Sequence, residues 1–245
     1  MKYPKFKRLG VLVPATNNAV EADFQQNLVT GVSVHTARLT IVDGELSAAT
    51  LDGMNNVLSD AVRDLKAAHV DAIAYGCTSG SFYKGPGWDD DVINLIREIA
   101  GVPAIATSPS VISALRDKRA RRLSVVTPYP QDLNARLKTY LENAGFEVMS
   151  IAGDARSAAR GHRAVNDQDP AEIAEFAIRH WVPEADALFC SCTAWRAMEA
   201  IPEILAVTGK PVITSNQATI WASMRLLAPE GKSEESATIS TSRSA

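Results

Sequence analysis

Short runs of apolar, often β-branched residues alternate along the chain with longer segments in which apolar positions recur every three or four residues. The short runs are bounded by glycine or proline and are typical of buried parallel strands, whereas the longer spacing is typical of helices with one buried face. This alternation predicts an α/β fold built from parallel sheets flanked by helices. The expected strands are Leu9–Val13, Val34–Ile41, Ala72–Tyr75, Ala104–Ala106, Leu123–Val126, Glu147–Ile151, Ala187–Cys190 and Val212–Thr214.

The clearest helical pattern lies between Thr50 and Ala68. Its apolar residues fall every three or four positions, which marks one face of an amphipathic helix. We therefore predict a single helix across this segment, leading into the strand that precedes Cys77. The apolar positions are Leu51, Met54, Leu58, Ala61, Leu65 and Ala68.

The sequence repeats internally. The segment LGVLVP at 9–14 resembles LSVVTP at 123–128, and DAIAYGCT at 71–78 resembles DALFCSCT at 186–193. The two pairs have the same separation to within one residue, so two strand-and-loop units recur together. A third similarity links VPAIATS at 102–108 with KPVITS at 210–215.

This repetition predicts two pseudo-symmetric α/β lobes, residues 1–117 and 118–228, with a cleft between them. The last helix, expected at Gln217–Leu227, would cross back to pack on the first lobe. Residues 229–245 are rich in serine, threonine and charge and are expected to form a disordered tail.

Cys77 and Cys192 occupy equivalent places in the repeat, each at the carboxyl end of an expected strand. Ligands of open α/β sheets bind at such ends, and a thiol beside small hydroxyl residues and a helix start can be activated as a thiolate. A single buried cysteine is usually only a small apolar residue, but two at equivalent positions favour thiol chemistry. Cys190 points to the same side as Cys192 but deeper, and we interpret it as structural.

Composition excludes several classes of function. The net charge of −3 argues against a nucleic-acid surface, and no apolar run approaches the length of a membrane span, so a cytoplasmic protein is expected. Three cysteines in 245 residues do not indicate a disulfide framework. The cysteines and four histidines show no metal-ligand spacing, and phosphate-binding glycine loops and the nucleophile elbow are missing from the sequence, so we expect neither metal nor cofactor.

Three polar loops follow expected strands and offer further ligand contacts. The loop from Pro14 to Glu21 contains Asn17, which could bind a ligand or cap a helix. Tyr129 stands between two prolines and could present its phenol to a carboxylate or simply pack. The loop beginning at Ser215 has the same two interpretations, binding or capping.

Five motifs together resemble the maleate cis–trans isomerase and arylmalonate decarboxylase branch of the aspartate/glutamate racemase superfamily, across about residues 8 to 228. They are PATNNxVE (14–21), GCTSGSFY (76–83), TPYxxxxN (127–134), CTA (192–194) and SNQATxW (215–221). The resemblance implies two flavodoxin-like lobes, an active site in the cleft between them, catalysis without metal or organic cofactor, and a homodimer or higher homo-oligomer.

The same resemblance implies roles for individual residues. Cys77 and Cys192 would be the two catalytic thiols, and the remaining site residues would hold the substrate carboxylates. Isomerases of this branch carry an asparagine about thirty residues before the second cysteine, where this chain has Arg160, Gly161 and His162. Asn166 is the nearest asparagine, so Asn166 and His162 are both expected at the site. The expected carboxylate-binding residues are Asn17, Thr78, Ser79, Tyr129, Thr193, Asn166 and His162.

The activity implied is the cis–trans isomerisation of maleate or a related small unsaturated dicarboxylate. Decarboxylases of the branch lack the first cysteine, so Cys77 disfavours a malonate-type decarboxylase without removing it. A two-thiol racemase of the amino-acid or hydantoin type is the main alternative, in which one thiolate removes a proton and the other thiol returns one. A non-catalytic carboxylate-binding module would not need two reactive thiols.

Overall fold

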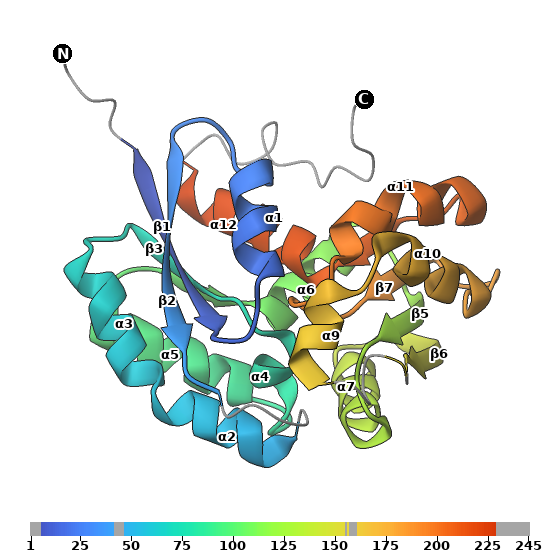
Figure 1. Ribbon diagram of the computed structural model, residues 1–245, viewed down its shortest axis with the longest axis horizontal. Coiled ribbons are helices and arrows are strands. Elements are labelled where there is room, and N and C mark those ends of the chain that lie inside the picture. The colour runs from blue at the N-terminus through green and yellow to red at the C-terminus, as the bar shows by residue number, and fades with distance from the viewer. Residues whose placement is uncertain (1–5, 42–46, 155, 157–160, 229–245) are drawn as a thin grey trace.

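The computed structural model describes residues 6–41, 47–154, 156 and 161–228, with Gly161 and His162 described by their backbone alone. Two four-stranded parallel sheets form the centre of the molecule (Figure 1). The first has the order β2-β1-β3-β4 and the second the order β6-β5-β7-β8, so the two sheets have the same topology. The strands are β1 (Lys7–Pro14), β2 (Val32–Leu39), β3 (Ala72–Tyr75), β4 (Ala104–Ala106), β5 (Arg122–Thr127), β6 (Glu147–Gly153), β7 (Ala187–Cys190) and β8 (Val212–Thr214).

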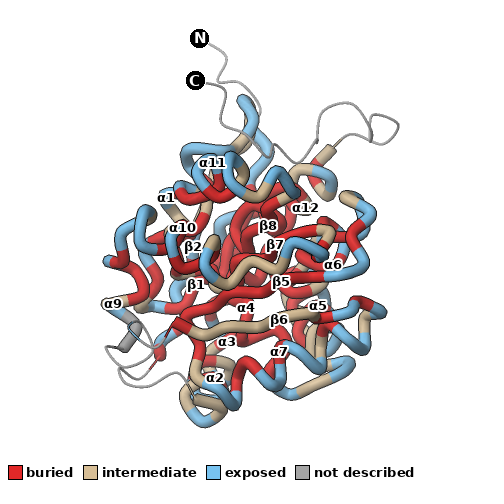
Figure 2. The backbone as a smooth tube through the Cα atoms, turned by 90° about the vertical axis from the view of Figure 1, so that its right-hand side faces the viewer, coloured by how far each residue is buried: buried red, intermediate tan, exposed pale blue. Residues whose placement is uncertain are grey.

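Helices cover both faces of each sheet, which explains why the inner strands are apolar without alternation. Every residue of β3, β7 and β8 is buried, and Figure 2 shows β7 and β8 as buried and the edge strand β6 as mostly intermediate. The two-lobed α/β fold expected from the sequence is confirmed. The helices are α1 (Ala19–Asn27), α2 (Ala48–Asn56), α3 (Leu58–Ala67), α4 (Thr78–Phe82), α5 (Trp88–Ala100), α6 (Thr107–Asp117), α7 (Gln131–Asn143), α9 (Gly161–Asp167), α10 (Pro170–Arg179), α11 (Ala197–Thr208) and α12 (Ser215–Leu227).

The single helix predicted from Thr50 to Ala68 is wrong, because two helices meet at Val57. Two asparagines end α2, and asparagine is a poor residue for the interior of a helix. The side chain of Asn55 donates to the Leu51 carbonyl oxygen at 3.0 Å and to the Tyr83 hydroxyl at 3.3 Å, which ties this end of α2 to α4. The apolar spacing continues across the break, so periodicity alone could not register it.

The last helix, α12, lies against α1 and α6 of the first lobe (Figure 1). Its residues Ile220 and Leu227 join an apolar cluster with Leu9 and Val11 of β1. The Thr219 hydroxyl donates to the Thr107 hydroxyl at 3.1 Å, which bonds α12 to α6. The chain therefore returns to its first half after completing the second sheet.

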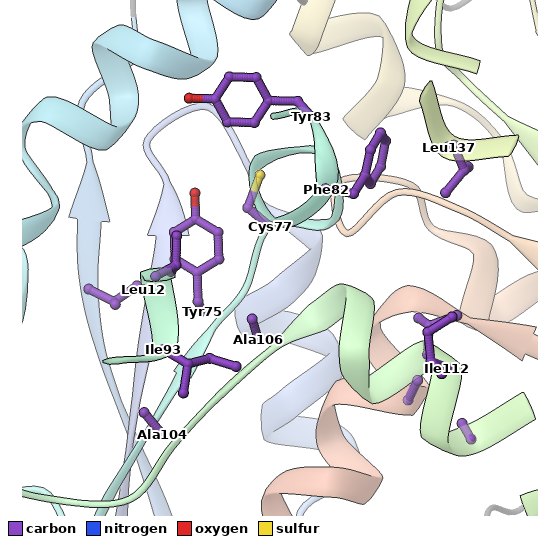
Figure 3. Close-up of a cluster of buried hydrophobic side chains, with 14 of the residues drawn as sticks. Leu12, Tyr75, Cys77, Phe82, Tyr83, Ile93, Ala104, Ala106, Ile112 and Leu137 are labelled. Atoms are coloured by element: carbon purple, nitrogen blue, oxygen red, sulfur yellow. The ribbon is translucent and has the colours of Figure 1, made fainter. Parts of the chain in front are cut away.

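A second apolar cluster includes residues of both sheets and of the helices between them. It contains Leu12 and Ile73 from the first sheet and Val125 and Phe189 from the second. Figure 3 shows part of this cluster around α4, with Phe82 close to Leu137 of α7. One apolar cluster thus extends through both lobes.

The expected disordered tail at 229–245 lies outside the described residues. Over the part of the chain that is described, none of the helices has both the length and the apolar character required to cross a membrane.

Candidate active site

A cavity of about 380 Å³, including its open mouth, lies where loops from both sheets meet. It opens at the carboxyl ends of the strands, as expected for parallel α/β sheets. Seven of the nine predicted site residues line it. Its lining consists of Pro14, Thr16, Asn17, Ile41, Leu51, Met54, Cys77, Thr78, Ser79, Tyr129, Cys192, Thr193 and Ala194.

Cys77 is buried and stands immediately before α4 (Figure 3). Its Sγ accepts a hydrogen bond from the Gly80 N–H at 3.3 Å and lies 3.8 Å from the Ser79 Oγ. Burial raises the pKa of the Cys77 thiol, while these two hydrogen bonds act in the opposite direction. The site therefore supplies donors that stabilise a thiolate once the proton has left.

Cys192 follows β7 in an unusual backbone conformation. Its φ of 139° lies in a region that residues with a side chain rarely adopt. The Cys192 N–H donates to the Ser215 Oγ at 3.0 Å, away from the strand ladder. Burial raises the pKa of Cys192 to about 12, although the side chain stays partly accessible. This thiol consequently keeps its proton at neutral pH.

Tyr129 contacts both thiol environments. It is buried, and its backbone is fixed by a hydrogen bond from its N–H to the Thr127 Oγ1 at 2.9 Å and by Asn134 Nδ2, which donates to its carbonyl oxygen at 3.2 Å. Burial raises the pKa of Tyr129 well above its usual value, and the charges that Cys192 and Cys77 would carry raise it further. The phenol is therefore a protonated hydrogen-bond donor inside the cavity.

Asn17 and Thr193 join the two lobes beside the cavity. Asn17 Nδ2 donates to the Thr193 Oγ1 at 3.0 Å, and the Thr193 hydroxyl donates to the Gly76 carbonyl oxygen at 3.1 Å. The Asn17 Oδ1 also accepts from the N–H groups of Ala19 and Val20, at 3.0 and 3.1 Å. Asn17 thus caps α1 and borders the cavity at once, so the two interpretations of its loop are compatible.

Asn166 and His162 are the predicted site residues that the cavity lining does not include. Asn166 Oδ1 accepts from the Asn18 N–H at 2.9 Å, and its Nδ2 donates to the Thr16 carbonyl oxygen at 2.8 Å. Asn166 therefore holds the loop that carries Asn17. The His162 backbone lies in α9, and its side chain is outside the described part of the chain.

The described lining of the cavity carries no formally charged side chain. A bound carboxylate would therefore be held by hydroxyl, amide and N–H donors. The nearby Arg38 is already engaged, since it donates to the Ala15 and Asn17 carbonyl oxygens at 3.0 and 3.1 Å and forms an ion pair with Glu21. Among the residues described, no group of three or more His, Cys, Asp or Glu side chains is arranged to hold a metal ion.

Sequence reasoning missed the apolar wall formed by Ile41, Leu51 and Met54. It also missed Tyr75, whose hydroxyl donates to the Asn55 Oδ1 at 2.7 Å beside the first cysteine (Figure 3). Ile41 comes two residues after β2, so the rule about strand ends could have found it. The other three residues carried only the signal of core positions.

Comparison with known proteins shows which family this chain resembles. A family model described as arylmalonate decarboxylase matches residues 9–240. The chain is 28% identical over 224 residues to the arylmalonate decarboxylase of Bordetella bronchiseptica, covering 89% of each protein. It is 25% identical over 232 residues to the maleate isomerase of Pseudomonas putida KT2440, covering 90% of this chain and 91% of that protein.

A solved structure extends the comparison to the fold. It is a maleate cis–trans isomerase mutant from Nocardia farcinica with a covalently bound succinylcysteine intermediate, 23% identical to this chain. The alignment covers 91% of this chain and 93% of that one, with a TM-score of 0.83. The resemblance expected from the sequence is thus confirmed, and the chain belongs to the arylmalonate decarboxylase family, with maleate isomerases among its relatives.

Proposed function

We propose that this protein is a cofactor-independent cis–trans isomerase of maleate or a related small unsaturated dicarboxylate. The observation that carries the proposal is that Cys77 and Cys192, from equivalent positions of the two lobes, line one cavity. Maleate isomerases among its relatives and the covalent succinylcysteine intermediate in the Nocardia farcinica enzyme support the same chemistry.

In the proposed reaction, Cys77 is the nucleophile. Its thiolate adds to one alkene carbon, and the electron pair of the double bond moves toward the carboxylate on the other carbon. Cys192 then donates its proton to that second carbon, which gives a succinyl thioether on Cys77. The central bond is now single, so it can rotate.

The second half reverses these steps. The Cys192 thiolate removes a proton from the carbon it protonated, the double bond re-forms in the trans geometry, and the Cys77 thiolate leaves. Both thiols return to their starting states, so no oxidant, reductant or added proton is consumed. We assign the nucleophile to Cys77 because α4 begins directly after it and its Sγ accepts from the Gly80 N–H. Cys192, whose pKa burial raises to about 12, also accepts backbone N–H bonds, from Ala194 and Trp195, but no helix of the described chain begins directly after it.

Negative charge develops on a carboxylate during addition, and neutral donors must stabilise it. Tyr129 supplies a protonated phenol, and the first N–H groups of α4, at Thr78 and Ser79, have no partners within the helix. The hydroxyls of Thr78 and Thr193 already donate to protein oxygens. In this proposal they shape the site, and they contact the substrate only if those bonds rearrange.

Decarboxylation of a substituted malonate is the second candidate. It is favoured by the 28% identity to an arylmalonate decarboxylase and by the apolar wall of Ile41, Leu51 and Met54, which could accept an apolar substituent. A two-thiol racemase would use the same pair of cysteines. Cytoplasmic location and a homodimer or higher oligomer stay predictions from the sequence.

The test is to incubate the purified protein, treated with a chelator, with maleate and to follow fumarate by proton NMR. We expect fumarate without any added cofactor, and loss of turnover in Cys77→Ala. In Cys192→Ser, solvent or the serine hydroxyl supplies the proton that forms the thioether, but no thiolate is present to remove a proton again. A stable mass increase equal to one maleic acid on Cys77 is therefore expected. Release of carbon dioxide from phenylmalonate without fumarate from maleate would replace the isomerase with the decarboxylase.

A parallel assay covers the racemase. An amino-diacid in heavy water would lose its α-proton signal if the thiols exchange that proton. Full activity of Cys77→Ala on maleate would refute the covalent mechanism.

A further inference from the structure

The Ser215 hydroxyl oxygen joins the two cysteine loops. It accepts one hydrogen bond from the Cys192 N–H at 3.0 Å and another from the Thr78 Oγ1 at 2.9 Å. Thr78 is the residue immediately after Cys77, so one oxygen atom bonds directly to both segments. Ser215 is fully buried, and Thr78 is nearly so.

The bond to Cys192 acts on a strained residue. A φ of 139° persists at a residue with a side chain only where the surroundings hold it. The preceding N–H, that of Ser191, still follows the sheet and donates to the Val126 carbonyl oxygen at 2.9 Å. The chain leaves the sheet at Cys192, whose N–H is the first that no longer bonds within the sheet and instead donates to the Ser215 Oγ.

We propose that Ser215 is a positioning residue that sets the direction of the Cys192 side chain and its separation from the Cys77 loop. The hydroxyl does not line the cavity, so its effect on chemistry is through these two bonds. The inference rests on the proposed function for the roles of the two thiols, but the position of Cys192 can be measured without turnover.

A buried serine of the first lobe, Ser108, one residue after the start of α6, provides a matched control. The Ser108 hydroxyl donates to the Thr78 carbonyl oxygen at 3.0 Å and accepts from the Ser81 hydroxyl at 2.7 Å. Ser108 is as buried as Thr78 and holds the same loop. Its hydrogen bonds all stay within the first lobe, so its removal should disturb the Cys77 loop without releasing Cys192.

The first experiment measures alkylation of each cysteine in the purified full-length chain by iodoacetamide between pH 7 and 10, with digestion and fragment-ion mass spectrometry to assign the label to Cys77, Cys190 or Cys192. In Ser215→Ala we expect Cys192 to react at least tenfold faster than in the unmodified protein, with its pH profile moved to lower pH. The reason is that burial is the main cause of the raised pKa of Cys192, and a released loop is less buried. In Ser108→Ala the labelling of Cys192 should not change.

The second experiment covers the case in which Ser215→Ala loses structure generally. Glycine adopts positive φ without strain, so Cys192→Gly removes the need for the restraint. We expect Ser215→Ala to lower the urea midpoint less in the Cys192→Gly background than in the parent protein. Equal losses in both backgrounds, or equal Cys192 labelling in Ser215→Ala and Ser108→Ala, would overturn the proposal.

Turnover gives a third readout. If the isomerase is correct, Ser215→Ala should lower kcat for maleate by about 10²-fold, the loss expected from a small misplacement of a reacting group, with a smaller change in KM. If the unmodified protein does not convert maleate while the labelling differences appear, the proposed function fails and the positioning role of Ser215 stands.

Discussion

Gly80 lies at the closest approach of three side chains around the first cysteine. A Cβ at residue 80 would stand 2.3 Å from the Tyr75 hydroxyl oxygen, 2.9 Å from the Met54 Cε and 3.0 Å from the Cys77 Sγ. We expect Gly80→Ala to lower the free energy of unfolding by about 1–3 kcal/mol, the usual cost of overpacking. It should also slow thiol chemistry at Cys77, because the sulfur or the tyrosine must move.

Gly53 is the control for this prediction. It is an exposed residue of α2, and a Cβ there would have no atom within 4 Å. Gly53→Ala should stabilise the protein by up to about 1 kcal/mol, since alanine is the better helix former. Urea unfolding and the alkylation rate of Cys77 measure both variants. A Gly80→Ala protein as stable and as reactive as Gly53→Ala would contradict the packing described around Cys77.

The sequence predicted that Cys77 and Cys192 would lie at one cleft. Two local signals supported this, because each cysteine ends an expected strand and the two stand at equivalent positions of the internal repeat. The sequence could not predict the connection made by Ser215, whose oxygen meets Thr78 across 137 positions of the chain. Asn166 illustrates the same limit. Its amide bonds to Thr16 and Asn18, about 150 positions away, and only the folded structure brings that loop to α9.

At the scale of elements, the start of α2 controls part of the cavity wall. Ser47 and Thr50 form a capping box there, in which the Ser47 hydroxyl accepts from the Thr50 N–H and the Thr50 hydroxyl accepts from the Ser47 N–H. The helix carries Leu51 and Met54 into the cavity. We expect Ser47→Ala to destabilise the protein by about 0.5–2 kcal/mol.

The matched variant is Ser113→Ala. Ser113 is exposed within α6, and its hydroxyl only donates to the Pro109 carbonyl oxygen of its own helix. Its replacement should be neutral or slightly stabilising. Thermal unfolding of both variants checks the difference. If Ser47→Ala and Ser113→Ala unfold at the same temperature, the capping box contributes nothing measurable.

Strands were more predictable than helices in this chain. The expected bounds of β3, β4, β7 and β8 agree with the structure because each is a short apolar run with clear flanking residues. The break between α2 and α3 was not predictable from periodicity, because the buried residues keep the same spacing on both sides of it. Near the break Asn55 donates to the hydroxyl of Tyr83, 28 positions further along the chain, a contact that sequence spacing does not encode.

At the scale of the whole molecule, the shared apolar cluster and α12 connect the lobes too closely for independent unfolding. The prediction is a single urea transition. It can be followed in two variants that each keep one tryptophan, Trp88 of the first lobe or Trp195 of the second, with the others replaced by phenylalanine. The two midpoints should coincide, because each sheet loses packed helices and apolar contacts when the other unfolds.

Thr219→Val provides a second test of whether the lobes unfold together. It removes the hydroxyl that bonds α12 to Thr107 in α6 and should lower the free energy of unfolding by about 1 kcal/mol. Both tryptophans should report the same decrease. Separate midpoints, or a decrease seen by only one tryptophan, would mean that the lobes unfold independently.

The two sheets share a topology, yet the loops after β3 and β7 differ. Cys77 is followed at once by α4, whereas α11 begins only at Ala197, and the intervening residue Cys192 has positive φ. The cavity is therefore handed, although its scaffold is nearly symmetric. A flat, prochiral ligand held there meets a different sulfur environment on each face, so an atom added to it enters from one fixed side.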